Sequence, residues 1–229
     1  DLAKELYKDF LREVFGLGDR ELPDHRARDG QALAGGEEED FHRLHRFGDF
    51  RLALYPRRGG RTPELDAPGT LEWIGRFIGR IHAVGALEPF ATRPTLDIAT
   101  FGDEPRAFVL QHDFIPPDLL EAYESISAMA LDGVRHCYAR AGDVRHLRLH
   151  GDCHASNILW TPDGPHFVDF DDARMGPAIQ DLWMLLSGER IEMRQQPGAL
   201  LAGYEDFADI DRRELHLIEA LGTLRLLHY

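Results

Sequence analysis

The feature that most constrains this chain is a polar run between two apolar, strand-like ends, LRLHGDCHASNILW, from Leu147 to Trp160. Two histidines, an aspartate, a cysteine and an asparagine lie inside it. A buried polar group without a hydrogen-bond partner costs roughly 1 to 3 kcal/mol, so a hydrophobic core cannot simply absorb this run. The segment therefore predicts a site at which the chain meets solvent, metal or substrate.

The residues that follow predict a β-hairpin that places a second polar group beside the first. The turn TPDG, Thr161 to Gly164, separates apolar residues 158–160 from apolar residues 167–168. This hairpin brings HGDCHASN and FVDFDD side by side, with a shared set of polar residues: Asp152, Asn157, Asp169, Asp171 and Asp172. Carboxylate and carboxamide oxygens, completed by water, are the ligands that Mg²⁺ prefers.

Apolar periodicity elsewhere predicts a mostly helical chain around this small β-element. Helices are expected at 2–14, 71–84, 119–140, 178–186, 199–207 and from 214 onward, and strands at 50–56, 146–149, 158–160 and 166–170. Residues 21–49 show little periodicity and are expected to form a loop. Gly75 and Gly79 interrupt the apolar stripe of their helix, where they would let another backbone approach closely.

Composition indicates a globular protein of one large domain or two small ones. The chain has 229 residues, 43% of them hydrophobic, and a formal net charge of -14. That charge argues against nucleic-acid or anionic-membrane partners. No apolar run of about 18 residues and no charged-then-apolar leader occurs, so we expect a cytoplasmic protein, and a monomer. Its two cysteines, Cys137 and Cys153, are too few for a disulfide framework and lack zinc-site spacing.

The polar run carries a family resemblance. H-G-D-x-x-x-x-N, a hairpin and then hydrophobic-hydrophobic-Asp-hydrophobic resemble the catalytic and metal-binding loops of the protein-kinase-like fold, in its aminoglycoside phosphotransferase branch. With FVDFDDARMGPAIQDLWMLLSG, residues 145–188 are similar to the stress response kinase A family. The resemblance implies an α+β, protein-kinase-like fold, largely the helical C-terminal lobe (57–229). Residues 1–56 would be a remnant of the N-terminal nucleotide-binding lobe and hinge.

The same resemblance implies a role for each motif residue. Asp152 would be the catalytic carboxylate, and Asn157 and Asp169 would hold Mg²⁺ and through it ATP. The backbone near Leu54 and Tyr55 would bind adenine as the hinge between lobes; an ordinary strand there is the alternative. The implied activity is transfer of the γ-phosphoryl group of ATP to a protein Ser/Thr hydroxyl in bacterial stress response. The alternatives are a small-molecule kinase, for an aminoglycoside or a choline-like acceptor, and a noncatalytic nucleotide-binding module.

Neighbouring polar residues allow both a structural and a chemical interpretation. We expect His150 to hydrogen-bond backbone near the metal loop rather than act as an acid or base. Asp181 resembles the buried helical aspartate that ties down the catalytic loop; the alternative is an acid favoured by a helix dipole. Zinc would need three or four ligands at defined spacings, so Cys153 is expected to be a small packed side chain, with a redox role as the alternative.

The sequence also departs from the kinase pattern. No G-x-G-x-x-G occurs, and its only lysines, Lys4 and Lys8, lie in the first predicted helix. We therefore expect most of the nucleotide-binding lobe to be absent from this chain. The alternative, which we favour less, is a degenerate kinase that binds nucleotide without catalysing transfer. Gly151 stands where regulated kinases carry an arginine, and residues 173–177 leave no room for a long activation segment. Activation by loop phosphorylation is not expected.

Overall fold

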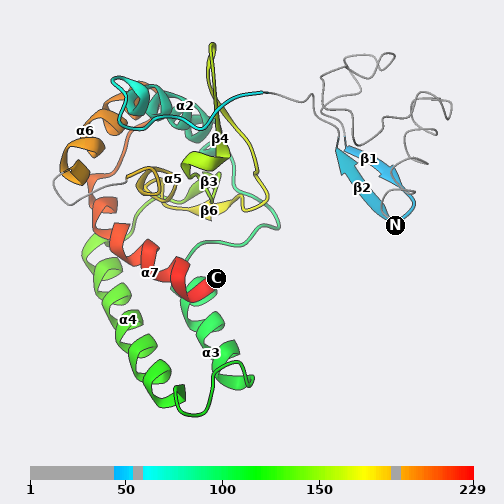
Figure 1. Cartoon of the computed structure of the whole chain (residues 1–229), viewed down its shortest axis with the longest axis vertical. Coiled ribbons are helices and arrows are strands. Elements are labelled where there is room, and N and C mark those ends of the chain that lie inside the picture. Colours follow the sequence, from blue (N-terminus) through cyan, green and yellow to red (C-terminus); the bar gives the residue numbers. More distant parts are fainter. Residues whose placement is uncertain (1–43, 54–58, 187–191) are drawn as a thin grey trace. The chain divides into compact units, whose positions relative to one another are not determined.

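The computed structural model describes residues 44–53, 59–186 and 192–229 (Figure 1). The chain divides into two compact units, Asp1–Gly59 and Gly60–Tyr229. In the first unit, β1 (Leu44–Phe47) and β2 (Phe50–Ala53) form an antiparallel hairpin. The strand predicted from residue 50 is confirmed at 50–53. The loop predicted over 21–49 is wrong at β1, because pairing with β2 extends a segment that has no periodicity of its own.

Two of the sequence predictions fall outside the described residues. They are the first helix, at 2–14, and the adenine-binding backbone at Leu54 and Tyr55.

In the second unit, α2 (Thr70–Gly85) packs directly on α6 (Glu192–Tyr204) (Figure 1). Glycines let the two backbones touch: a Cβ at Gly75 would overlap the Leu200 carbonyl, and one at Gly203 would overlap the Glu72 carbonyl. The predicted close approach at Gly75 is thereby confirmed. Its consequence is that the buried end of α6 comes within hydrogen-bond range of α2.

Four short strands form the β-element between the helices. β4 (Ile158–Thr161) and β5 (Gly164–Phe167) are the predicted hairpin, and β3 (Leu147–Leu149) pairs antiparallel with β6 (Arg174–Gly176). The strand expected at 166–170 ends at residue 167. The three residues of β6 were missed because so short a strand shows no alternation, and its pairing with β3 alone defines it.

The remaining helices surround this element. A π-helical turn (Ala99–Asp103) leads into α3 (Glu104–Gln111), followed by α4 (Leu120–Ala141) and α5 (Gln180–Trp183). A 3₁₀ segment (Arg212–Leu217) leads into α7 (Ile218–His228), which packs along α4 (Figure 1). α3 was missed because none of its residues is buried, so it carries no apolar stripe for a sequence pattern to reveal.

One contiguous core joins these helices and strands. Its fully buried side chains include Ile74, Ile78, Ile158, Ile179, Leu182, Leu185, Leu200, Tyr204, Leu217 and Leu221. None of the helices in the described residues is long and apolar enough to span a bilayer.

Candidate functional site

The catalytic-loop candidate begins where β3 ends. The His150 imidazole Nε2 lies 2.8 Å from the Val168 carbonyl oxygen, so His150 links this loop to the segment after β5. The hydrogen bond predicted between His150 and the backbone near the metal loop is confirmed. Gly151 has a φ of +89°, and a Cβ there would overlap the Asp172 carbonyl. Residues 150–151 are thus fixed by the backbone of the second polar segment.

Asp152 presents only part of its carboxylate to solvent. Its side chain is 16% exposed, and its Oδ1 is buried and accepts no hydrogen bond from the described residues. On the other oxygen, Oδ2, the neighbours are His154 Nε2 at 3.3 Å and Asn157 Nδ2 at 3.4 Å. Because Oδ1 is buried, Oδ2 is the carboxylate oxygen that remains as a candidate to receive an incoming hydroxyl.

Asn157 and Asp169 are brought together by the β4–β5 hairpin. The Val168 N–H donates to the Asn157 carbonyl oxygen at 3.0 Å, which places Asp169 beside Asn157. The Asn157 amide nitrogen donates to the Asp152 carbonyl oxygen at 3.0 Å, which turns its carboxamide oxygen away from Asp152. Asp169 is exposed, with a φ of 65°, a left-handed conformation that Asp and Asn tolerate better than most residues.

Asn157 and Asp169 fit a cation that keeps most of its ligands as water and phosphate oxygens. Within the ranges that the structure describes, no three His, Cys, Asp or Glu side chains gather as a metal-ligand set. Two hard oxygens from the protein are typical of Mg²⁺ bound together with a nucleotide. Asp172, another oxygen candidate, is engaged elsewhere, because its carboxylate pairs with Arg174 and accepts from the Tyr229 hydroxyl.

A buried hydrogen-bond network connects the catalytic loop to the helices that pack against it. Asp181 on α5 accepts the His150 N–H at 2.7 Å and the Gly151 N–H at 2.9 Å. The predicted tie between Asp181 and this loop is therefore confirmed. His82 Nε2 on α2 lies 2.9 Å from Asp181 Oδ2, and His82 Nδ1 lies 3.0 Å from the Tyr204 hydroxyl on α6.

The fully buried side chains of this network satisfy one another. A neutral His82 with its proton on Nε2 donates to Asp181 and accepts from Tyr204, so no polar group is left unpaired. The sequence indicated Asp181 but not Tyr204, because a tyrosine in an apolar helical pattern looks like any core residue. Burial raises the pKa of the Tyr204 hydroxyl, which keeps it protonated as a donor.

Cys153 faces the core beside Asp152 rather than the open site. It is 1% exposed, and burial raises the pKa of its thiol well above the usual value. A thiol that stays protonated is a poor metal ligand and a poor nucleophile. The predicted packed side chain is confirmed.

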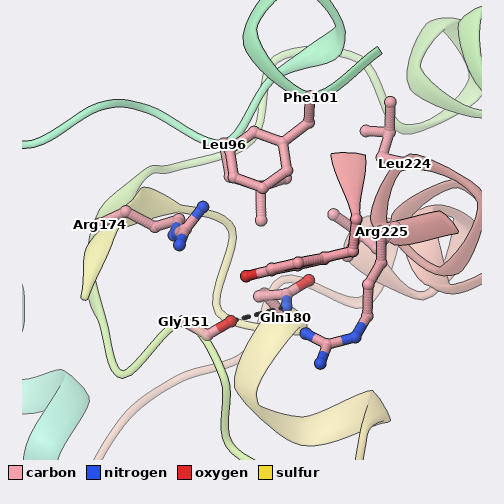
Figure 2. A pocket seen from close by; sticks show the side chains of 9 residues that line it. Leu96, Phe101, Gly151, Arg174, Gln180, Leu224 and Arg225 are labelled. Carbon is pink, nitrogen blue, oxygen red and sulfur yellow. Dashed lines mark hydrogen bonds between the residues drawn. The ribbon is translucent and has the colours of Figure 1, made fainter. Parts of the chain in front are cut away.

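A small pocket borders the catalytic loop on the side of α7. Arg174 and Arg225 approach it from opposite sides, with Gly151 and Gln180 between them and Leu96, Phe101 and Leu224 at its apolar end (Figure 2). Gln180 Nε2 donates to the Gly151 carbonyl oxygen at 3.1 Å. The sequence did not indicate this pocket, since its walls come from distant parts of the chain.

Glu214 holds the segment that leads into α5. It is 3% exposed, and its Oε2 accepts the Ile179 N–H at 2.9 Å. Burial, the largest effect, raises the pKa of this carboxyl group from 4.5 to about 7, although backbone hydrogen bonds oppose it. The folded state therefore binds the Glu214 proton more tightly than the unfolded state does.

This raised pKa predicts a pH-dependent stability. The contribution of Glu214 is complete below pH 4.5 and is lost as the pH rises towards about 7. At about 1.4 kcal/mol per pKa unit, the free energy of unfolding should fall by roughly 3 kcal/mol over this interval. In Glu214→Gln the decrease should be absent. Urea denaturation across the interval measures it, with exposed Glu219→Gln as the control; an unchanged pH profile in Glu214→Gln would contradict the assignment.

Solved structures with a similar arrangement identify the fold. Amicoumacin kinase hAmiN, in complex with AMP-PNP, Ca²⁺ and Ami, superposes with a TM-score of 0.58 at 20% identity, over 76% of this chain and 54% of its own. Aminoglycoside phosphotransferase APH(3'')-Id from Streptomyces rimosus superposes with a TM-score of 0.51 at 19% identity, over 79% of this chain and 74% of its own. The chain has the aminoglycoside phosphotransferase, protein-kinase-like fold, and the predicted α+β class is confirmed.

Sequence comparison then gives the family. Residues 16–218 match the phosphotransferase enzyme family, and the chain belongs to it. Stress response kinase A of Salmonella choleraesuis and the serine/threonine protein kinase RdoA of Salmonella typhimurium are each 43% identical to this chain over 180 residues. Each match covers 79% of this chain and 54% of the relative, so the chain spans about half the length of these curated relatives.

Proposed function

We propose that this chain supplies the catalytic and metal loops of an ATP- and Mg²⁺-dependent phosphotransferase that moves the γ-phosphoryl group of ATP to a hydroxyl. The observation that carries the proposal is the Asp152 side chain, which is 16% exposed and whose Oδ2 lies 3.4 Å from the Asn157 amide nitrogen. Phosphoryl transfer depends on positioning and charge neutralisation, for which one proton acceptor and two oxygen ligands suffice.

Each site residue has one task in this reaction. Asp152 Oδ2 accepts the hydrogen of the acceptor hydroxyl and orients its oxygen towards the phosphorus. The oxygens of Asn157 and Asp169 would hold Mg²⁺, which neutralises charge on the phosphates when it is bound. His150 and Asp181 keep the two loops in register through their backbone contacts.

A protein Ser/Thr hydroxyl is the acceptor that we favour. Support comes from the 43% identical relatives, whose names specify a stress response kinase and a serine/threonine protein kinase. A role in bacterial stress response is proposed on the same ground. We also propose that the backbone at Leu54 and Tyr55 is the hinge that binds adenine.

The proposed metal site leads to a specific prediction. Asp169→Asn should weaken Mg²⁺-dependent binding of AMP-PNP by about tenfold or more, which corresponds to about 1.4 kcal/mol. Asparagine tolerates the left-handed backbone of this residue, so the fold should persist. Isothermal titration calorimetry of the complete gene product, with and without Mg²⁺, measures the effect. Exposed Asp171→Asn is the matched control; a loss there instead would make Asp171 the ligand.

Transfer itself is tested with the complete gene product, radiolabelled ATP and Mg²⁺. The acceptors are dephosphorylated casein, the protein's own hydroxyls, and a panel of aminoglycosides and amino alcohols. Labelled phosphoserine or phosphothreonine supports the protein acceptor, whereas labelling of a panel compound alone assigns a small-molecule kinase. Nucleotide binding without transfer to any acceptor would show a noncatalytic module.

A further inference from the structure

An arginine from the C-terminal helix reaches the catalytic carboxylate. Arg225 Nη1 on α7 lies 2.7 Å from Asp152 Oδ1, and the two side chains are 33% and 16% exposed. The angle is not that of a hydrogen bond, since Oδ1 accepts none from the described residues. The contact is therefore an ion pair at a half-buried position, where salt screens it less than on the open surface.

The packing of α7 fixes where this guanidinium lies. Leu221 and Leu224, on the turn before Arg225, are buried in the core. The guanidinium carbon lies 4.9 Å from the centre of the Tyr229 ring, within the range of a cation–π contact. Figure 2 shows Arg225 reaching past Gln180 towards the Gly151 end of the catalytic loop. Arg225 is thus presented to Asp152 by a rigid helix.

The two oxygens of Asp152 consequently differ in their surroundings. Oδ1 is buried and lies against Arg225, whereas Oδ2 lies near His154 and Asn157. A carboxylate that rotated freely would offer either oxygen in several directions. With Oδ1 held by a cation, only Oδ2 is presented, in one direction.

We infer that Arg225 is a positioning residue for phosphoryl transfer: it holds Asp152 Oδ1 so that Oδ2 receives the acceptor hydroxyl in line with the phosphoryl group. The inference rests on the proposed function. Because an error of about 1 Å in a reacting group can cost 10²-fold in rate, loss of Arg225 should act on turnover more than on nucleotide binding.

The test compares kcat and the KM for ATP in the complete gene product, in the transfer assay with the best acceptor. Arg225→Gln should lower kcat by about 10- to 100-fold and leave the KM for ATP nearly unchanged. Arg225→Lys, which keeps the charge, should recover part of the loss. Millimolar guanidinium should raise the rate of Arg225→Gly. Arg212→Gln is the matched control, since Arg212 pairs with Glu205 at 2.6 Å, away from Asp152.

The possible outcomes separate this inference from the proposed function. If the wild-type protein is no more active than Asp152→Asn, both the inference and the proposed function are overturned. If the wild type is active and Arg225→Gln reacts at the same rate as Arg212→Gln, the inference alone is overturned. An Arg225→Gln variant faster than wild type would also overturn it, because Arg225 would then inhibit transfer. Equal losses in Arg225→Gln and Arg225→Lys, without guanidinium rescue and with a lowered urea midpoint, would show a purely structural ion pair and also overturn it.

Discussion

Asp152→Asn in the complete gene product should lower kcat by about 10²- to 10⁴-fold, which is the usual contribution of a positioned general base. Asparagine has nearly the same volume as aspartate but cannot accept the hydroxyl proton. The hydrogen bond from Asn157 Nδ2 to the carbonyl oxygen of residue 152, 3.0 Å long, does not involve the altered group. The ion pair with Arg225 is weakened, but the loop backbone is still held by Asp181 through the His150 and Gly151 N–H groups, so affinity for AMP-PNP should change little.

Steady-state kinetics and calorimetry on the same preparation measure both parts of this prediction. Asp163→Asn is the matched control, because Asp163 is an exposed residue in the turn between β4 and β5 and its substitution changes the charge equally. Near-normal turnover in Asp152→Asn would remove this carboxylate from the mechanism. A matching loss of nucleotide affinity would instead place Asp152 among the groups that bind ATP.

The second large effect is expected in the buried network below the loop. Asp181→Ala leaves three donors without an acceptor: the His150 N–H at 2.7 Å, the Gly151 N–H at 2.9 Å and the His82 imidazole at 2.9 Å. A buried donor left without an acceptor typically costs about 1–3 kcal/mol, and three such donors are left here. Because domains are stable by only about 5–15 kcal/mol, the variant should unfold much more readily than wild type.

Urea denaturation gives the free energy of unfolding for this comparison. Asp209→Ala, at an exposed position after α6, is the control and should change it little. The loss of unfolding free energy in Asp181→Asn should lie between those of the other two variants. The carboxamide oxygen of asparagine can still accept a hydrogen bond, but its NH₂ group would face another donor. A loss in Asp181→Ala no larger than in Asp209→Ala would mean that water or a rearranged loop satisfies these donors.

The sequence was sufficient where a pattern is local. The order of residues from His150 to Asn157, the turn after Thr161 and the stripe of α2 each lie within about twenty residues, and the structure contains the loop, the hairpin and the helix. Gly75 was also informative, because a glycine within a strong helical stripe suggests a close backbone contact.

The rest depends on contacts between distant segments. The contacts of Tyr204 and Arg225 depend on how α6 and α7 return to the loop, and nothing in the sequence around either residue indicates its partner. The sequence did not reveal α3 because this helix buries no residue and so has no apolar stripe. Local periodicity reports burial, and it does not report which distant residue a buried group faces.

The positive φ of Gly151 limits how an enzyme of this design could be controlled. Any side chain at this position would collide with the Asp172 carbonyl as well as adopt an unfavourable conformation. An arginine that senses a phosphorylated loop cannot be gained here by one substitution, because the neighbouring segment would have to move first. A switch built on an arginine at this position would therefore require a prior change in the backbone around residue 172.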